Sequence, residues 1–466
     1  MNKKKKIKYI NISERKVLLR LFDLLSVFVG IYFIARFLGV SYITFDNEMT
    51  SKWVLTFLIY FLLFGHIFDM YNLKVSSSRF LAFQSSLITS FTSIMFYMFT
   101  PRLTPSLPND RIEILYLFLA VLIPTTIWRF IYSTYIFSPR LLKNILIIGN
   151  AKKVKNILTI IEKKNFQNNI IGYIADTPIE SKEAYKYTAI QDANLLEIVQ
   201  NITIDEIVIS ENSIDLSKNP EISKQIIYLF EHGINIKSIE NLYEEITLSI
   251  AQENLNKDFY KHISFSKNHE NTFYLLFVRV FDIFISILGI LSLCFFIPFV
   301  FLGNMIGSKG PLFYKQIRVG RNGMHFKIYK FRSMVVNAEK EGKAVWASKE
   351  DTRITIFGKF LRKTRIDEIP QFLNILLGEM SLIGPRPERP EFVNNLQKEL
   401  PFYAIRHVIS PGLTGWAQVM YPYANTVKEQ EIKLRYDLYY IKYRGLFMDF
   451  KILIKTIATV LRFKGQ

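Results

Sequence analysis

The chain has 466 residues, more than one hydrophobic core usually organises, so two or more domains are expected. Half of its residues are hydrophobic, including 40 Phe and 25 Tyr, a balance that suits a protein whose surface is shared between water and lipid. The formal net charge of +19 favours anionic partners, namely nucleic acid, phosphate-bearing substrates or an acidic membrane face. The single cysteine, Cys294, excludes an intrachain disulfide and a cysteine zinc cluster.

Four apolar segments come first, and each is close to the ~20 residues needed to cross a bilayer. They are Val17 to Leu38, Trp53 to Phe68, Phe80 to Phe99 and Ile112 to Tyr132. The first contains charged residues and the third contains many hydroxyls, so buried helices of a soluble protein are the alternative. Because four such segments follow one another, we predict that residues 1–139 form a Lys-rich cytoplasmic tail and a four-helix transmembrane bundle.

The distribution of charge predicts the orientation of these spans. A run of basic residues precedes the first segment, and Lys74 and Arg79 separate the second from the third. The loop between the first two segments instead holds Asp46 and Glu48. By the positive-inside rule the basic loops are cytoplasmic, and an even number of spans returns the chain to the cytoplasm.

A different pattern follows in residues 140–268, where short β-type runs alternate with amphipathic stretches. Asn144 to Ile148 and Glu206 to Ser210 are typical of buried parallel strands, so a Rossmann-like α/β cytoplasmic module is expected. Only Gly149 stands where a dinucleotide-binding turn carries three glycines. We therefore assign this module no cofactor and predict a scaffold or regulatory role.

A fifth apolar segment runs from Phe273 to Ile306, within a predicted membrane domain of residues 269–306, and is uncharged from Ile283 to Leu302. It contains Pro298, and proline removes a backbone donor and clashes with the preceding turn of a helix. A plain fifth span would carry the basic C-terminal region outside the cell, away from soluble nucleotides. A re-entrant membrane helix, broken at Pro298 and leaving by the face through which it came in, keeps that region cytoplasmic, and this is our prediction.

The C-terminal region, residues 307–466, contains the groups that can carry chemistry. Asp367 and Glu368 stand just before Pro370 and an apolar run with helical spacing, a pattern typical of a helix start. Helix capping alone explains an isolated pair of this kind. Adjacent carboxylates at a positive helix end also stay ionised, so one can attack phosphorus while both engage a divalent cation.

Basic segments on both sides of this pair favour the second explanation. Downstream, three prolines stiffen the Gly384 to Pro390 turn around Arg386, whose planar guanidinium is suited to bind a diphosphate. Upstream, a predicted hairpin carries Lys315, Lys330 and Arg332, which suit anionic headgroups or a lipid phosphate beside a membrane segment. A solvated loop and a solvated basic face are the alternatives.

The last apolar segment, Phe447 to Leu461, has helical spacing with Lys451 and Lys455 among its apolar residues. We predict an interfacial C-terminal helix that lies in the plane of the membrane surface. Packing against the core of the domain is the alternative.

Four motifs of this region resemble the bacterial sugar transferases, the monotopic-type polyprenyl-phosphate hexose-1-phosphate transferases that initiate surface polysaccharides. They are Lys330 to Met334, Asp367 to Gln371, Gly378 to Pro387 and Pro411 to Trp416. The likeness covers about Phe273 to Lys464, and the four preceding spans with the α/β module are similar to the large subgroup of the family. One departure is Ile297, because family members often place a serine before the proline of the re-entrant helix.

The resemblance implies a C-terminal α/β catalytic domain that acts in two steps. Asp367 attacks the sugar-linked phosphorus of a UDP-sugar, expels UMP and becomes a covalent phosphosugar aspartate, which polyprenyl phosphate then displaces. Mg²⁺ held at Asp367 and Glu368 neutralises the diphosphate. The implied phosphate-binding residues are Arg386, Arg365, Lys330, Arg332 and Lys315.

The same resemblance implies a bacterial inner-membrane location, with the catalytic domain facing the cytoplasm. The expected partners are a UDP-sugar, polyprenyl phosphate, membrane lipids and a second copy in a homodimer, and nucleic acid is not among them. The sugar stays open among glucose, galactose and an N-acetylated amino sugar. A non-catalytic membrane scaffold is the alternative function, and a nucleotide-sugar dehydratase or epimerase lacks the glycine-rich turn it needs after Ile148.

Overall fold

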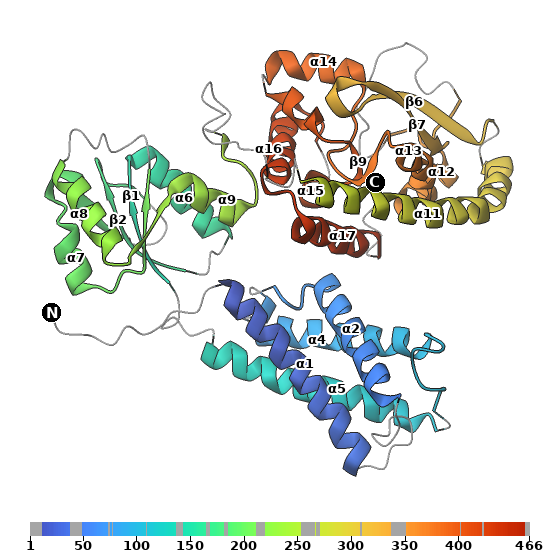
Figure 1. Ribbon diagram of the computed structural model, residues 1–466, viewed down its shortest axis with the longest axis horizontal. Coiled ribbons are helices and arrows are strands. Elements are labelled where there is room, and N and C mark those ends of the chain that lie inside the picture. Colours follow the sequence, from blue (N-terminus) through green and yellow to red (C-terminus); the bar gives the residue numbers. More distant parts are fainter. Residues whose placement is uncertain are drawn as a thin grey trace. The chain divides into compact units, whose positions relative to one another are not determined.

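The computed structural model describes residues 12–37, 49–72, 75–76, 78–108, 110–136, 143–164, 168–180, 185–210, 220–252, 266, 271–307, 310–336, 351–400, 402–421 and 424–461. The chain divides into two compact units, Met1–Ile246 and Thr247–Gln466 (Figure 1). The first unit contains apolar helices and an α/β module, and the second contains the fifth apolar segment and the basic C-terminal region. Lys74, Asp46 and Glu48, which support the predicted orientation, lie outside the described residues.

Within the described part of the first unit, four long helices coincide with the four predicted spans. They are α1 (Ile12–Phe37), α2 (Thr50–Ile67), α4 (Arg79–Met98) and α5 (Ile112–Ile131), the last followed by a π-helical turn, Tyr132–Ile136. Each is long and apolar enough to cross a membrane. Helix α1 packs on α5, α5 on α4 and α4 on α2 around a core that includes Val27, Phe61 and Val121. Outward-facing residues such as Ile59 and Phe91 are exposed and apolar, as a lipid-facing surface requires.

Two of the charges inside the apolar segments form a buried ion pair. Asp23 of α1 and Arg129 of α5 are both fully buried, and Arg129 Nε donates to Asp23 Oδ1 at 3.0 Å. Arg129 Nη1 also donates to the hydroxyl of Ser76 at 2.9 Å, and its guanidinium lies 5.5 Å from the ring centre of Tyr71. A buried charge is tolerated when it is paired and hydrogen-bonded in this way.

The α/β module is built on one parallel sheet in the order β3-β2-β1-β4-β5. Its strands are β1 (Asn144–Ile148), β2 (Asn169–Ala175), β3 (Lys186–Ala189), β4 (Glu206–Ile209) and β5 (Asn235–Ser238). Helices α6 (Ala151–Lys164) and α9 (Ile239–Thr247) contribute to the core on one face, and α7 (Leu195–Asn201) and α8 (Pro220–Glu231) to the core on the other (Figure 1). The predicted α/β module and its first strand are confirmed, and the strand predicted to end at Ser210 ends at Ile209.

In the turn after β1, side chains of the protein accept hydrogen bonds from the first backbone amides of α6. Ala151 N donates to Asp176 Oδ1 at 2.7 Å, and Lys152 N donates to Asn150 Oδ1 at 2.9 Å. These are the first amide groups of α6, the donors that receive phosphate in dinucleotide-binding folds. At this turn a carboxylate of the protein occupies the position at which a phosphate would bind.

The first long helix described in the second unit is α11 (Thr272–Gly307), which has 36 residues and continues across Pro298. At 1.5 Å per residue it is ~54 Å long, well beyond the ~30 Å hydrocarbon core of a bilayer. Figure 1 shows it bending towards its carboxyl-terminal end. The predicted helix is confirmed, but proline does not interrupt it, because losing one backbone donor leaves the other bonds of the helix in place. Its re-entrant course stays a prediction.

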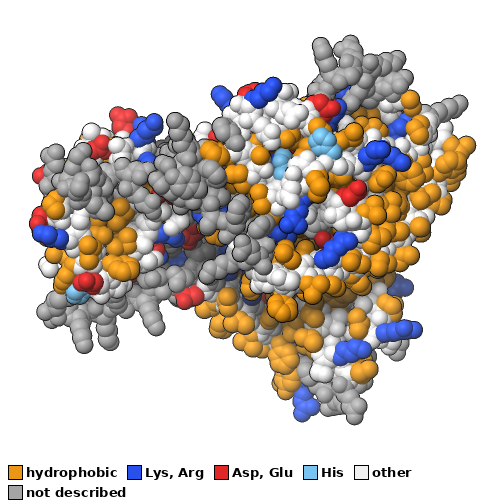
Figure 2. All heavy atoms as spheres, turned by 45° about the horizontal axis from the view of Figure 1, so that its top comes forward, with side chains coloured by type: hydrophobic (Ala, Val, Ile, Leu, Met, Phe, Trp, Pro, Cys, Tyr) orange, Lys and Arg blue, Asp and Glu red, His pale blue; other side chains and the backbone are white. Residues whose placement is uncertain are grey.

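One face of α11 is packed and the opposite face is not. Gly289 lies against the ring of Phe372, and a Cβ there would come within 2.2 Å of that ring, so the close approach requires glycine. Leu293 and Val300 are buried with residues of the hairpin and of α12. On the outer face Leu291, Phe295 and their neighbours are exposed, and Figure 2 shows hydrophobic side chains gathered along the edge of the unit where α11 lies. This surface is suited to contact lipid.

The remaining elements of the second unit are a hairpin, helices of 5 to 17 residues and a pair of short strands, and among them α12, η7, α13 and β8 contact α11. Strands β6 (Phe313–Val319) and β7 (His325–Phe331) form the predicted antiparallel hairpin, closed by a 3₁₀ turn at Arg321–Gly323. The helices are α12 (Ile356–Thr364), α13 (Phe372–Leu377), α14 (Pro390–Glu399), α15 (Trp416–Met420), α16 (Val427–Tyr443) and α17 (Leu446–Leu461), with 3₁₀ segments η7 (Ile366–Gln371) and η8 (Tyr403–Val408). Strands β8 (Ser381–Ile383) and β9 (Gly412–Thr414) pair in parallel.

Helix α17 both packs against the core of the unit and exposes an apolar face, so it has features of the two alternatives predicted for the last apolar segment. Ile452 is fully buried in the main core of the unit, whereas Phe447 is 95% exposed and Phe450 is 61% exposed. One face of the helix therefore packs, and the other presents aromatic residues to the surroundings. This distribution fits the predicted interfacial position, which stays a prediction.

Candidate active site

Asp367 and Glu368 lie on η7, between α12 and α13. Arg365 ends α12 in a left-handed conformation with φ of 61°, and this reverses the chain so that the two carboxylates turn inward. Both are buried, with 6% and 8% of their surfaces exposed. Asp367 Oδ1 has no hydrogen-bond partner among the described residues, so the capping explanation does not account for this atom.

Glu368 is surrounded by cations from three parts of the chain. Its Oε1 atom lies 3.1 Å from Lys330 Nζ of β7 and 2.9 Å from Arg386 Nη2, and its Oε2 atom lies 3.1 Å from Arg365 Nη1. Burial alone would raise the pKa of Glu368, but Lys330 and the two arginines hold that pKa well below its usual value. Three of the five predicted phosphate-binding residues thus meet at one carboxylate.

Asp367 has a different environment from its neighbour. Burial raises the pKa of its carboxyl to about 6, opposed mainly by the charge of Lys330. A buried acceptor without a partner costs about 1–3 kcal/mol and commonly marks a functional site. The two adjacent carboxylates therefore differ: cations pair with Glu368 and lower its pKa, whereas burial raises the pKa of Asp367 to about 6 and its Oδ1 atom has no partner among the described residues.

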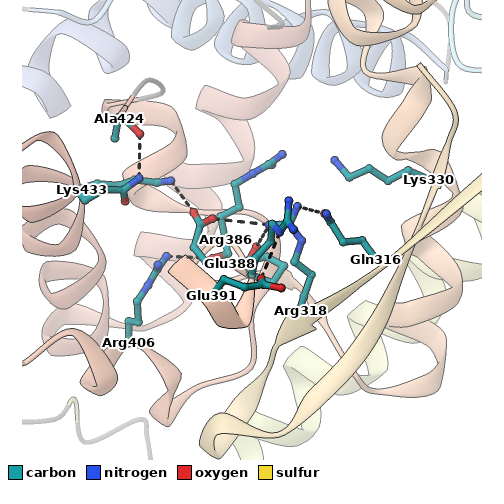
Figure 3. Close-up of polar contacts among 12 residues, drawn as sticks. Gln316, Arg318, Lys330, Arg386, Glu388, Glu391, Arg406, Ala424 and Lys433 are labelled. Carbon is teal, nitrogen blue, oxygen red and sulfur yellow. Dashed lines mark hydrogen bonds and ion pairs between the residues drawn. The ribbon is translucent and has the colours of Figure 1, made fainter. Parts of the chain in front are cut away.

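The loop that carries Arg386 is held from two directions (Figure 3). Arg406 Nη2 of η8 donates to the carbonyl oxygen of Arg386 at 3.0 Å, and the same guanidinium forms an ion pair with Asp437 of α16 at 2.8 Å. Arg318 Nη1 of β6 donates to the carbonyl oxygen of Pro387 at 3.2 Å. These contacts fix the backbone from which the Arg386 side chain reaches Glu368.

Glu388 adds a third attachment, two residues after Arg386. It accepts a hydrogen bond from Lys433 Nζ of α16 at 3.1 Å and lies 3.7 Å from Arg318 Nη1. Burial would raise the pKa of Glu388, but Lys433 and the neighbouring arginines lower it to about 2. Figure 3 shows Lys433 and Arg318 approaching Glu388 from opposite sides. This network was not predicted from the sequence, in which its one local signal is the i, i+4 spacing of Lys433 and Asp437 on a helix.

Arg362 of α12 is a further cation that the sequence analysis missed. Its Nε donates to Ser333 Oγ at 2.9 Å, and its charge lowers the pKa of Asp367. It stands on the last turn of the helix that leads into the carboxylate pair, so its place in the sequence was the available signal.

Two of the predicted phosphate-binding residues lie elsewhere. Lys315 Nζ is 5.3 Å from the ring centre of Tyr329, directly across the hairpin. Arg332 follows the end of β7, where Nε donates to Pro311 O at 2.7 Å and Nη2 donates to Asn304 Oδ1 at 3.0 Å. Arg332 therefore ties the end of α11 to the hairpin, and its predicted role in phosphate binding receives no support from this geometry.

The cluster leaves the Asp367 carboxylate available to a cation. In the described ranges no group of three or more His, Cys, Asp or Glu residues gathers as a metal site. Both Glu368 oxygens face cationic side chains, which leaves Asp367 Oδ1 open. Mg²⁺ is commonly bound by one or two carboxylates and completed by water and phosphate oxygens. These residues thus fit a Mg²⁺ ion that is shared with a phosphate-bearing ligand.

Comparison with known proteins gives matches to this unit and beyond it. A protein of Aeromonas hydrophila named UDP-N-acetylgalactosamine-undecaprenyl-phosphate N-acetylgalactosaminephosphotransferase is 51% identical over 154 residues, which is 33% of this chain and 36% of that protein. A Xanthomonas campestris pv. campestris UDP-glucose:undecaprenyl-phosphate glucose-1-phosphate transferase is 30% identical over 302 residues, or 63% and 61%. This chain thus spans about a third and about three fifths of the lengths of these two relatives.

A shorter relative is covered almost completely. The exopolysaccharide production protein PSS of Rhizobium leguminosarum bv. phaseoli is 40% identical over 197 residues, which is 41% of this chain and 98% of that protein. Residues 273–463 match the family model described as bacterial sugar transferase, and that range contains α11, the paired carboxylates and every cation around them. The carboxylate cluster therefore lies in the part of the chain that the family model matches, and the chain belongs to the bacterial sugar transferase family.

Proposed function

We propose that this chain transfers a hexose-1-phosphate from a UDP-sugar to undecaprenyl phosphate and releases UMP. The observation that carries the proposal is the open Oδ1 atom of buried Asp367, set beside a carboxylate that holds three cations. The names of the first two relatives supply the substrate classes, a UDP-sugar and undecaprenyl phosphate.

In the first step a carboxylate oxygen of Asp367 bonds to the sugar-linked phosphorus. The bond from that phosphorus to the bridging oxygen breaks, and UMP leaves with the electron pair. Lys330, Arg365 and Arg386 place positive charge where the diphosphate and the departing phosphate develop negative charge. Glu368 keeps these cations together and so acts as a positioning residue.

In the second step an oxygen of the polyprenyl phosphate bonds to the phosphorus of the phosphosugar aspartate. The bond to Asp367 breaks, which restores the carboxylate and gives the polyprenyl diphosphosugar. In the first step, Mg²⁺ held by the Asp367 carboxylate would supply charge neutralisation to the diphosphate and the departing UMP. We place this reaction at the cytoplasmic face of the bacterial inner membrane, with α11 as the re-entrant helix, as the first membrane step of exopolysaccharide, capsule or O-antigen synthesis.

The covalent step is tested by trapping the intermediate. With UDP-sugar present and acceptor withheld, we expect the peptide that contains Asp367 to gain the mass of a hexose phosphate, and UMP to appear in equal amount. A panel of UDP-glucose, UDP-galactose and their N-acetylated amino analogues identifies the sugar. Accumulation of lipid-linked product while the Asp367 peptide never gains mass would show that another group is the nucleophile.

The rate of this first step is expected to depend on pH through Asp367. Only the ionised carboxylate attacks, and burial raises the pKa of Asp367 to about 6, so UMP release falls as the pH is lowered through that value. Glu368 stays ionised throughout, because the surrounding cations hold its pKa well below the usual value. Single-turnover measurements from about pH 5 to about pH 8 check this, and a profile flat down to the lower limit would be inconsistent with it.

A further inference from the structure

The second unit contains an apolar cavity of ≈360 Å³ between α11, β8 and α17. Its walls include Phe277, Phe281, Leu382, Ile383, Phe450 and Leu453. The carboxylates that border it are used by the protein, since Asp282 Oδ1 accepts from Leu382 N at 2.9 Å and Asp449 Oδ1 accepts from Tyr440 OH at 2.7 Å. The size falls in the range of about 300–1,000 Å³ that small-ligand sites occupy, and the lining suits a hydrocarbon.

The cavity is continuous with the apolar surface of the unit. Phe277 at its α11 wall is 55% exposed, and Phe447 and Phe450 at its α17 wall are 95% and 61% exposed. Helix α11 is long and apolar enough to cross a membrane, so the surface on which the cavity opens is one that faces lipid. An occupant therefore comes from the bilayer, as a hydrocarbon chain.

Strand β8 links the cavity to the phosphate-binding cluster. Ile383 lines the cavity, and Arg386, three residues further on, forms its ion pair with Glu368. Three residues of extended chain span at most ~10 Å. A lipid whose phosphate lies at Arg386 therefore has the start of its chain within reach of the cavity.

We propose that this cavity receives the hydrocarbon chain of the acceptor, close to its phosphate-bearing end. The inference rests on the proposed function, since it takes the acceptor to be a polyprenyl phosphate. A bilayer phospholipid is a poorer occupant, because the link through β8 favours a lipid that presents its phosphate to the reacting centre. The cavity thereby aligns the acceptor for the second step and leaves the first step untouched.

Filling the cavity from opposite walls tests this. Leu453→Trp on α17 and Val278→Phe on α11 are each expected to lower kcat/KM for undecaprenyl phosphate about tenfold, the loss expected when about two CH₂ groups leave an apolar site. UMP release without acceptor should stay within about twofold of wild type, which also shows that each variant is folded. Efficiency with methyl phosphate, which has no isoprenyl chain, should be equally unaffected.

Matched controls place the same bulk outside the cavity. Val280→Phe on α11 and Ile457→Trp on α17 alter residues that are 58% and 43% exposed, and both should behave as wild type. Unchanged efficiency with undecaprenyl phosphate in the filled variants overturns the proposal. If the filled variants are no longer stabilised by phospholipid against heat but keep wild-type kinetics with undecaprenyl phosphate, the cavity binds a bilayer lipid, and this result also overturns the proposal. Absence of UMP release by the wild type would instead refute the proposed function.

Discussion

The Asp367→Asn variant is expected to lose UMP release by a factor of about 10⁴ or more, because an amide cannot attack phosphorus and no other described carboxylate at the cluster is free to do so. Glu368 lies next to it, but both of its oxygens face cationic side chains. Glu391→Gln is the matched control, since Glu391 is 58% exposed and pairs only at the surface with Arg389. Turnover close to wild type in Asp367→Asn would show that Asp367 is not the nucleophile.

The same substitution is expected to make the folded protein more stable. The pKa of Asp367 is 3.8 as a reference value and about 6 in the folded state, so ionisation of the wild-type carboxyl progressively favours unfolding as the pH rises from 3.8 to about 6. A pKa difference of this size corresponds to roughly 2–3 kcal/mol of unfolding free energy. The wild-type protein has lost all of this stability once the pH is above about 6. Asparagine carries no such charge, so its advantage should be complete at neutral pH and absent in acid.

Thermal unfolding in one detergent at about pH 4 and about pH 7.5 measures this difference. A higher melting temperature for Asp367→Asn at neutral pH alone is the expected result. Equal stability at both pH values would mean that the carboxylate is solvated in the folded protein, and the pH dependence of the first step should then be absent as well.

Replacement of Arg129 by methionine is expected to destabilise the helical part of the first unit by about 3–5 kcal/mol. The change leaves the Asp23 carboxylate fully buried between α1 and α5 without its partner, and also removes the hydrogen bond to Ser76. Breaking a buried pair costs more than replacing both members, so the double variant Asp23→Leu with Arg129→Met should recover most of the loss.

The unfolding midpoint of purified protein in detergent measures the effect. Arg111→Met is the control, because Arg111 stands exposed at the amino-terminal end of the same helix and should be neutral. A similar midpoint for Arg129→Met and wild type would show that Asp23 is hydrated or protonated in this bundle and needs no cation.

Local patterns were enough for the features that depend on neighbouring residues. Apolar length located α1, α2, α4, α5 and α11, and uninterrupted apolar runs located β1 and β4, because hydropathy and side-chain periodicity are properties of a short stretch of chain. The order of motifs from Lys330 to Trp416 was sufficient to indicate the family, which the comparisons establish.

Contacts between distant segments were decided by packing alone. Lys330 and Arg386 reach Glu368 from 38 residues before it and 18 residues after it, while Arg332 is drawn instead to α11. Asp23 and Arg129 are 106 residues apart, and no local sequence pattern in either segment predicts that they pair. The carboxylate pair can thus be read from the sequence, whereas its cations can be chosen only by the folded chain, since a buried charge is matched by whatever opposite charge the packed elements bring within reach.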